Sequence, residues 1–125
     1  MAIILIVLTL TLITVTIHHG CLIGIKNGLL KSARQPQHWI VGTTVILLLL
    51  AHILEITFFA LGYFVIENYF NAGQILGENS EGITAALYFS FSSYTTLGIG
   101  DLYPTGTIRL LSGFEGLLGL SLIHI

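Results

Sequence analysis

Two long apolar segments with almost no charge constrain this chain more than any other feature. Ala2–Ile17 contains no charged residue, and Trp39–Ile66 contains a single one, Glu55. Charged residues make up only 8% of the 125 residues, whereas soluble domains carry about 25%. A water-soluble globule would therefore lack the polar groups needed to cover its surface. The sequence predicts an all-α membrane protein.

The first apolar segment, Ala2–Ile17, is long enough to form most of a membrane span. Its residues cover about 24 Å as a helix, slightly less than the ~30 Å hydrocarbon core of a bilayer. A cleaved signal peptide is the alternative, but no basic residue precedes the segment and no small-residue cleavage site follows it. We therefore expect a retained transmembrane helix.

Polar residues just after this segment do not suggest a metal site. His18 and His19 are adjacent, so on a helix their side chains would point about 100° apart. Cys21 is the single cysteine, which excludes an intrachain disulfide. We expect the two histidines to be polar residues at a membrane boundary.

Two polar links on either side of the second apolar segment carry opposite charges. Residues 18–38 contain only basic charges, and residues 67–82 contain only acidic ones. Because short basic loops remain in the cytoplasm, we expect the first link inside the cell, and the second link and the amino terminus outside. Pro36 suits the start of a helix, where its missing N–H costs nothing. The charged residues of the links are Lys26, Lys31, Arg34, Glu67, Glu78 and Glu81.

Two shorter apolar segments follow the second link. Ile83–Thr96 is too short to cross a bilayer but suits a re-entrant helix, with Ser80 as a candidate N-cap. Ile108–Ile125 is long enough to span and is the third predicted transmembrane helix. It ends without the usual basic flank, so we expect the chain to be truncated.

The sequence TTLGIGD, Thr95–Asp101, lies between these two segments. It lacks the spacing and the lysine of a phosphate-binding loop, and the residues before it alternate too weakly for a hairpin. Irregular backbone at membrane depth persists only where it lines a polar cavity. Glycine at alternate positions permits positive φ, so successive carbonyls can point to one side. Four such strands around an axis would form rings of oxygens that replace the hydration shell of a cation.

The longer sequence TTLGIGDLYP, Thr95–Pro104, resembles the selectivity-filter signature of potassium channels, usually TVGYGD with the same aspartate and often the same LYP. The resemblance covers Ile83 to about Ile125. It implies a pore domain over residues 39–125, preceded by residues 1–38, a transmembrane helix with a basic cytoplasmic loop. Its parts would be an outer helix at 39–66, a pore helix and filter at 81–101, and a truncated inner helix at 107–125.

The resemblance also implies roles for the residues of the motif. Potassium ions would bind the backbone carbonyls of Thr96, Leu97, Gly98 and Ile99 and the hydroxyl of Thr96. Gly100 would shape the outer mouth of the filter. Thr95, Asp101 and Ser92 would support it.

Ile99 departs from the family pattern, which usually has tyrosine there. Isoleucine can pack behind a filter but cannot donate a hydrogen bond, and the pore helix has no tryptophan, its aromatic residues being Tyr88, Phe89, Phe91 and Tyr94. We therefore expect potassium preference, with a weakly selective cation pore as the alternative.

Four ionisable residues within predicted membrane helices have two interpretations each. His52 and Glu55 are three residues apart on one helix, so their side chains can meet, as a structural contact or as a proton sensor. Glu115 could hydrogen-bond Ser92 or Ser93 or face the pore cavity, and we favour the structural contact. Arg109 could pair with Asp101 or extend to the membrane interface.

Gly113, Gly116 and Gly119 recur every three residues on the last helix. Small residues let membrane helices approach closely. We favour packing over a gating hinge for this stripe.

Together these features predict a homotetrameric, potassium-selective or potassium-preferring channel of the plasma membrane that crosses it several times. Its ligands would be monovalent cations, with the permeant K⁺ and no other cofactor, and its surroundings the lipid bilayer; no feature indicates nucleic acid or an enzyme. The alternatives are a non-conducting or modulatory subunit and, less favoured, a transporter core.

Overall fold

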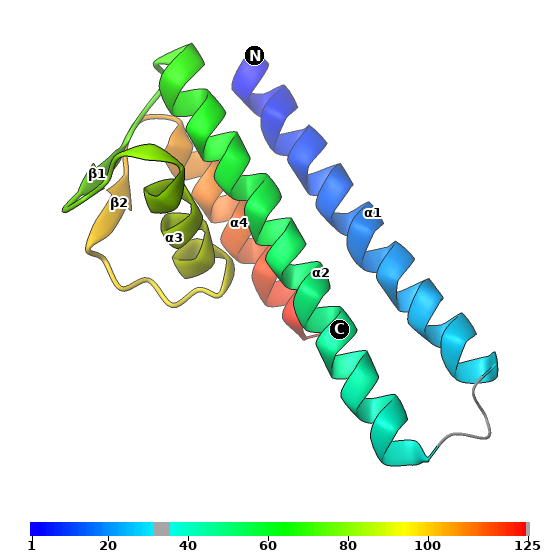
Figure 1. The fold of residues 1–125 in the computed structure, drawn as a ribbon. Helices are drawn as coiled ribbons and strands as arrows, with labels where there is room; N and C mark the ends of the chain where they lie inside the picture. Colours follow the sequence, from blue (N-terminus) through cyan, green and yellow to red (C-terminus); the bar gives the residue numbers. More distant parts are fainter. Residues whose placement is uncertain (32–35, 125) are drawn as a thin grey trace.

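The computed structural model describes residues 1–31 and 36–124 of the chain. Two long helices, α1 (Ala2–Lys31) and α2 (Gln37–Val65), lie antiparallel and side by side (Figure 1). The short helix α3 (Gly82–Tyr94) and the helix α4 (Ile108–Ile123) both pack against α2. The strands β1 (Ile75–Gly77) and β2 (Leu102–Pro104) lie with α3 on the side of α2 away from α1 (Figure 1).

Helix α1 is twice as long as the sequence predicted. The segment from His18 to Lys31, predicted as part of a polar link, continues the helix, so that α1 has 30 residues. This stretch alternates glycines and polar residues with leucine and isoleucine and contains no proline, so nothing in it stops the helix. Arg34, the third basic residue of that link, lies outside the described residues.

Helix α2 begins directly after Pro36, which is its N-cap residue. Pro36 has φ −58° and ψ 136°, and its carbonyl accepts the N–H of Trp39 at 3.1 Å. A proline at this place lacks an N–H that the helix would leave unpaired in any case. At its other end α2 continues into one π-helical turn, Ile66–Phe70, which ends at Asn71 in the left-handed region. Within the described residues, two helical segments are long and apolar enough to cross a membrane, Ala2–Leu29 and Gln37–Phe70.

The second predicted link contains structure that the sequence did not reveal. Its strand β1 pairs antiparallel with β2, with Ile75 opposite Pro104 and Gly77 opposite Leu102. Strands of three residues are too short to show alternation, so the prediction of an all-α protein missed this sheet. The predicted cap Ser80 is also wrong, because Glu81 occupies the N-cap position of α3 and makes no side-chain capping bond.

The core lies where all four helices meet. Side chains from α2 and α4, among them Phe59, Tyr63 and Leu111, are fully buried there. On α4, Gly119 faces the carboxyl end of α3 so closely that a Cβ would lie 1.9 Å from the carbonyl oxygen of Tyr94. A Cβ on Gly116 would lie 3.3 Å from the Ser93 carbonyl, whereas one on Gly113 would meet nothing within 4 Å. The packing role predicted for this stripe is therefore confirmed for two of its three glycines.

Gly119→Ala should destabilise the protein, because its methyl group would overlap the backbone of α3. Overpacking of this kind costs typically about 1–3 kcal/mol. Gly113→Ala is the matched control on the same helix, and it should be neutral or slightly stabilising, since alanine is favoured over glycine in a helix by about 0.5–1 kcal/mol. Thermal unfolding in detergent checks this, and equal unfolding temperatures for the two variants would contradict the close approach.

Candidate functional site

The segment Thr95–Asp101 connects the carboxyl end of α3 to β2 through irregular backbone. Thr96, Gly98 and Gly100 have φ of 57°, 57° and 87°, whereas Leu97 and Ile99 between them have negative φ. The sign of φ therefore alternates residue by residue along the loop. Thr96 is a β-branched residue in the left-handed region, a conformation that costs L-residues roughly 1–2 kcal/mol, so the surroundings must hold it there.

Hydrogen bonds from the last turns of α3 hold this loop. The carbonyl of Ser92 accepts the N–H groups of Leu97 and Gly98 at 3.0 and 3.4 Å, and its hydroxyl accepts the N–H of Ile99 at 3.4 Å. The carbonyl of Ser93 accepts the N–H of Thr96 at 3.1 Å. Four successive N–H groups thus point toward α3.

The carbonyl oxygens of the same stretch lack such partners. Within residues 1–31 and 36–124, no hydrogen bond reaches the carbonyl oxygens of Thr96, Leu97, Gly98 or Ile99. The Thr96 hydroxyl donates to the carbonyl of Thr95 at 2.7 Å, and the Thr95 hydroxyl donates to the Phe91 carbonyl at 2.6 Å. A row of free oxygens with its N–H groups tied back is an arrangement that can coordinate a dehydrated cation.

Asp101 lies at the carboxyl end of the loop and is held there by two hydrogen bonds. Its carboxylate accepts a hydrogen bond from the Tyr88 hydroxyl at 2.8 Å and another from the N–H of Leu102 at 2.9 Å. The sequence identified Asp101 as a supporting residue and Tyr88 only as an available aromatic. The pairing joins residues 13 positions apart, across the irregular loop, where no periodicity indicates which side chains meet.

One side of the loop is open within a single chain. Leu97 and Ile99 have exposed fractions of 68% and 57%, so neither side chain packs behind the loop as a buried residue. A cavity of about 280 Å³ is lined by residues of α3, the loop and α4, including Ser93, Gly98 and Ser112. The exposed side chains of Leu97 and Ile99 can therefore contact a neighbouring molecule.

Glu115 on α4 is fully buried and joins three helices. Its carboxylate hydrogen-bonds the Tyr63 hydroxyl of α2 and the Ser90 hydroxyl of α3. Ser90 also contacts the carbonyl of Ile56 at 2.8 Å. The sequence predicted a structural contact from Glu115 to the pore helix but named the wrong serines; its partner is Ser90. Among the described residues Arg109 forms no ion pair, so the pair with Asp101, one of its two alternatives, is not found.

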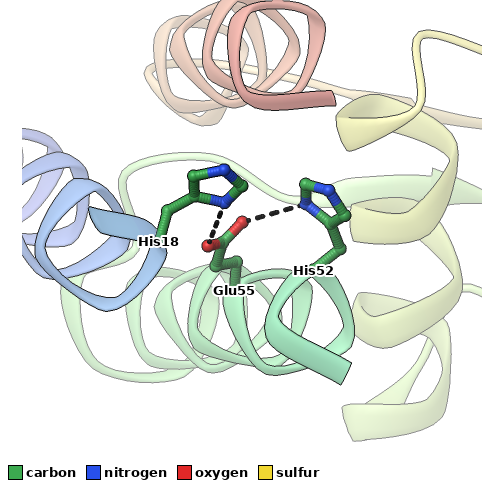
Figure 2. A group of neighbouring side chains, drawn as sticks. All are labelled: His18, His52 and Glu55. Carbon is green, nitrogen blue, oxygen red and sulfur yellow. Dashed lines mark hydrogen bonds and ion pairs between the residues drawn. The ribbon is translucent and has the colours of Figure 1, made fainter. Parts of the chain in front are cut away.

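Glu55 on α2 is the second fully buried carboxylate. His52 Nδ1 lies 3.3 Å from its Oε2, which confirms the predicted contact, and Tyr94, the last residue of α3, donates its hydroxyl to the same carboxylate. Figure 2 shows that His18 of α1 points at the other oxygen, with its Nδ1 at 3.2 Å from Oε1. His18 is 3% exposed, so its predicted place at a membrane boundary is wrong.

A helical stripe in the sequence could have revealed His18. Among the residues of α1 whose burial is described, the buried ones are Val7, Leu10, Thr14 and His18, which recur at spacings of three and four and so share one face of the helix. This signal was hidden because most positions of the segment around them are also apolar.

Comparison with known proteins assigns this arrangement to a family. An ion channel family model matches residues 39–125, which is more than half of the chain. The protein belongs to this ion channel family. No curated protein and no solved structure matches it. The matched region begins near the start of α2 and includes α3, the loop and α4, and it leaves α1 outside.

Membership in an ion channel family has three consequences for this chain. The apolar helices belong to a membrane protein, the activity to expect is the passage of ions, and the family is generally not enzymatic. The irregular loop at Thr95–Asp101 lies inside the matched region.

Variants at Glu115 should show whether the hydrogen bonds of its carboxylate stabilise the fold. Glu115→Leu leaves the Tyr63 hydroxyl without its partner, at a cost of about 1–3 kcal/mol, whereas the Ser90 hydroxyl keeps the Ile56 carbonyl. Glu115→Gln can accept from Tyr63 and donate to the oxygen of Ser90, so its unfolding temperature should stay close to that of the wild type. Thermal unfolding in detergent measures both variants. A glutamine variant as unstable as the leucine variant would show that the hydrogen bonds do not explain the burial of Glu115.

Proposed function

We propose that this chain supplies one quarter of a potassium-preferring cation channel whose filter is TLGIG, Thr96–Gly100. Potassium ions would bind between successive rings of carbonyl oxygens from Thr96, Leu97, Gly98 and Ile99. Conduction would be passive, with ions passing from one ring to the next. The channel would need no cofactor other than the permeant ion.

The alternating sign of φ along the loop is the observation that carries this proposal. Positive φ at Thr96, Gly98 and Gly100 alternates with negative φ at the residues between them. This alternation lets the carbonyl groups of neighbouring residues point to the same side of the chain. The N–H groups are tied to Ser92 and Ser93, which leaves the oxygens for a ligand. A dehydrated cation needs such a set of fixed oxygens in place of its water shell.

The openness of the loop supports a homotetramer. The free oxygens and the exposed Leu97 and Ile99 of one chain would face lipid if the chain stood alone, and unpaired backbone groups are costly in a bilayer. Closing the ring with copies of the same chain covers these groups, since identical subunits assemble with closed symmetry.

The proposed membrane placement follows from the directions of the helices. Helices α1, α2 and α4 would span the plasma membrane, and α3 would enter from outside and return through the filter. The basic residues Lys26 and Lys31 lie at the end of α1 that leads to α2, away from the strands (Figure 1). That end would be cytoplasmic, and the end with the strands and the amino terminus would be outside.

Ile99 supports a second candidate, a weakly selective cation channel. Its side chain is 57% exposed in one chain, and it has no group to hydrogen-bond with an aromatic shell. Among the described residues, the hydrogen bond found at this position is the one that its backbone N–H donates to the Ser92 hydroxyl, at 3.4 Å. The side chain of Ile99 would then be held by packing between subunits.

Gly98→Ala should abolish potassium flux in liposomes that contain the purified protein. A Cβ on Gly98 meets nothing within 4 Å in one chain, so the substitution acts mainly by opposing φ of 57°, at a cost of roughly 1–2 kcal/mol in each subunit. Gly113→Ala is the matched control, with equally open space but a helical backbone, and it should conduct. Flux that survives Gly98→Ala, or a conducting preparation with the mass of a monomer or dimer, would contradict the proposed filter.

Ile99→Tyr should keep conduction and leave potassium preference equal to or higher than that of the wild type. A tyrosine restores the hydroxyl that the family usually has at this position, and the exposed surroundings of Ile99 leave room for it. Reversal potentials in mixed potassium and sodium solutions measure the preference. A clear fall in potassium preference would show that isoleucine is matched to its own pocket in the assembled channel.

A further inference from the structure

We propose that His18, His52 and Glu55 form a binding site for a divalent transition-metal cation of the zinc class, which joins α1 to the pore domain (Figure 2). The site draws one ligand from α1 and two from α2. Its existence does not depend on conduction through the filter, so metal binding and ion flux can fail separately.

The distances between the candidate ligand atoms fit such an ion. Tetrahedral zinc binds nitrogen and oxygen at about 2.0–2.1 Å, which sets neighbouring ligands about 3.3–3.4 Å apart. His18 Nδ1 lies 3.2 Å from Oε1 of Glu55 and His52 Nδ1 lies 3.3 Å from Oε2, and one ligand atom from each of the three residues lies within 4.8 Å of the other two. With Oε1 as the carboxylate ligand, the edge to His18 is already in place, and a small movement of the His52 imidazole completes the triangle.

The chemistry of the donors also fits. Two imidazoles and one carboxylate are a common zinc set that leaves one position open, and the same set suits other divalent first-row metals. Both histidines turn Nδ1 toward the same carboxylate, instead of toward separate backbone groups. Hard ions such as Mg²⁺ prefer oxygen ligands alone, so the nitrogen content selects against them.

Burial gives a physical reason for a cation at this place. Glu55 is fully buried and His18 is 3% exposed. Within the described parts of the chain, no lysine or arginine pairs with Glu55. A carboxylate among membrane helices is costly, and a bound divalent cation would supply positive charge directly beside it.

Tyr94 would orient the site from outside the ligand set. Its hydroxyl bonds the Glu55 carboxylate and lies 3.0 Å from His52 Nδ1. Ligating carboxylates are usually held by such a further hydrogen bond, and its loss typically lowers metal affinity 10–100-fold. One oxygen of Glu55 can bind the metal while the other keeps Tyr94, the residue that ends α3.

A groove lies between α1 and α2, on the side of the site toward the carboxyl end of α1. It has a volume of about 380 Å³ and is lined by residues such as Gly24, Gly28 and Thr44, with Leu47 among them. Cys21 lies beside Leu47, with its Sγ 3.8 Å from the Leu47 carbonyl, one helical turn from His18. The glycines keep the groove open from the end of the hairpin at which α1 leads to α2.

The test uses the purified full chain in detergent, titrated with Co²⁺ and followed by the visible absorption of the bound ion. We expect one Co²⁺ per chain, displaced by Zn²⁺, and a higher unfolding temperature with metal present. His18→Gln and Glu55→Gln should each lower the affinity at least tenfold, and Tyr94→Phe should lower it by a smaller factor. His19→Gln is the matched control, because His19 is exposed on the same helix, and it should bind as the wild type does.

His18→Cys guards against a variant that fails only because it is misfolded. A thiolate is also a ligand for these ions, so this variant should bind Co²⁺ and add a sulfur-to-cobalt absorption band that the wild type lacks. The proposal is overturned if no Co²⁺ or Zn²⁺ binds at one per chain at micromolar concentrations. Equal affinities for the wild type and His18→Gln, or no sulfur-to-cobalt band with His18→Cys, would also overturn it.

Discussion

Two buried carboxylates hold the short helix α3, and the rest of the structure depends on them. Glu55 of α2 accepts the Tyr94 hydroxyl at the end of α3, and Glu115 of α4 bonds Ser90 one turn earlier. Five residues of this 13-residue helix are buried, and its hydrogen bonds add to these contacts because hydrogen bonds are stronger in a low-dielectric interior than in water. The two carboxylates therefore hold α3 against α2 and α4.

The loop inherits its shape from α3 held in this way. Ser90 and Tyr94 are four residues apart and share the face of α3 that meets the carboxylates, while Ser92 and Ser93 between them bind the N–H groups of the loop. Gly119 lets α4 reach the Tyr94 backbone at the same point. An unbroken series of bonds thus runs from the buried carboxylates to the alternating backbone at Thr96, which cannot hold positive φ unaided.

The sequence predicted the parts of this fold that carry strong local signals. The apolar length of α2, the short helix α3 and the glycine pattern of the loop follow from composition, length and one recognised motif. The sheet and the partner of Glu115 were missed because each depends on contacts between distant segments, whereas the extension of α1 was missed because its glycines and polar residues were interpreted as a link. In a chain that is apolar almost everywhere, the face of a helix carries little contrast, so the sequence could not show which serine of α3 meets Glu115 or that His18 faces Glu55.

Helix α1 lies outside the region matched to the ion channel family. The position of His18 gives a structural reason for the presence of this helix. Leu10 of α1 fits against Gly62 of α2, where a Cβ would come within 2.6 Å of its Cδ1, and His18 reaches the carboxylate of Glu55 eight residues further along. Without α1, that carboxylate would lie on a helix face open to lipid, where an ionisable group is costly. Without Glu55, His18 would be a buried polar residue with no partner. Each residue makes the other tolerable inside the membrane, so α1 and the pore domain of this channel form one packing unit.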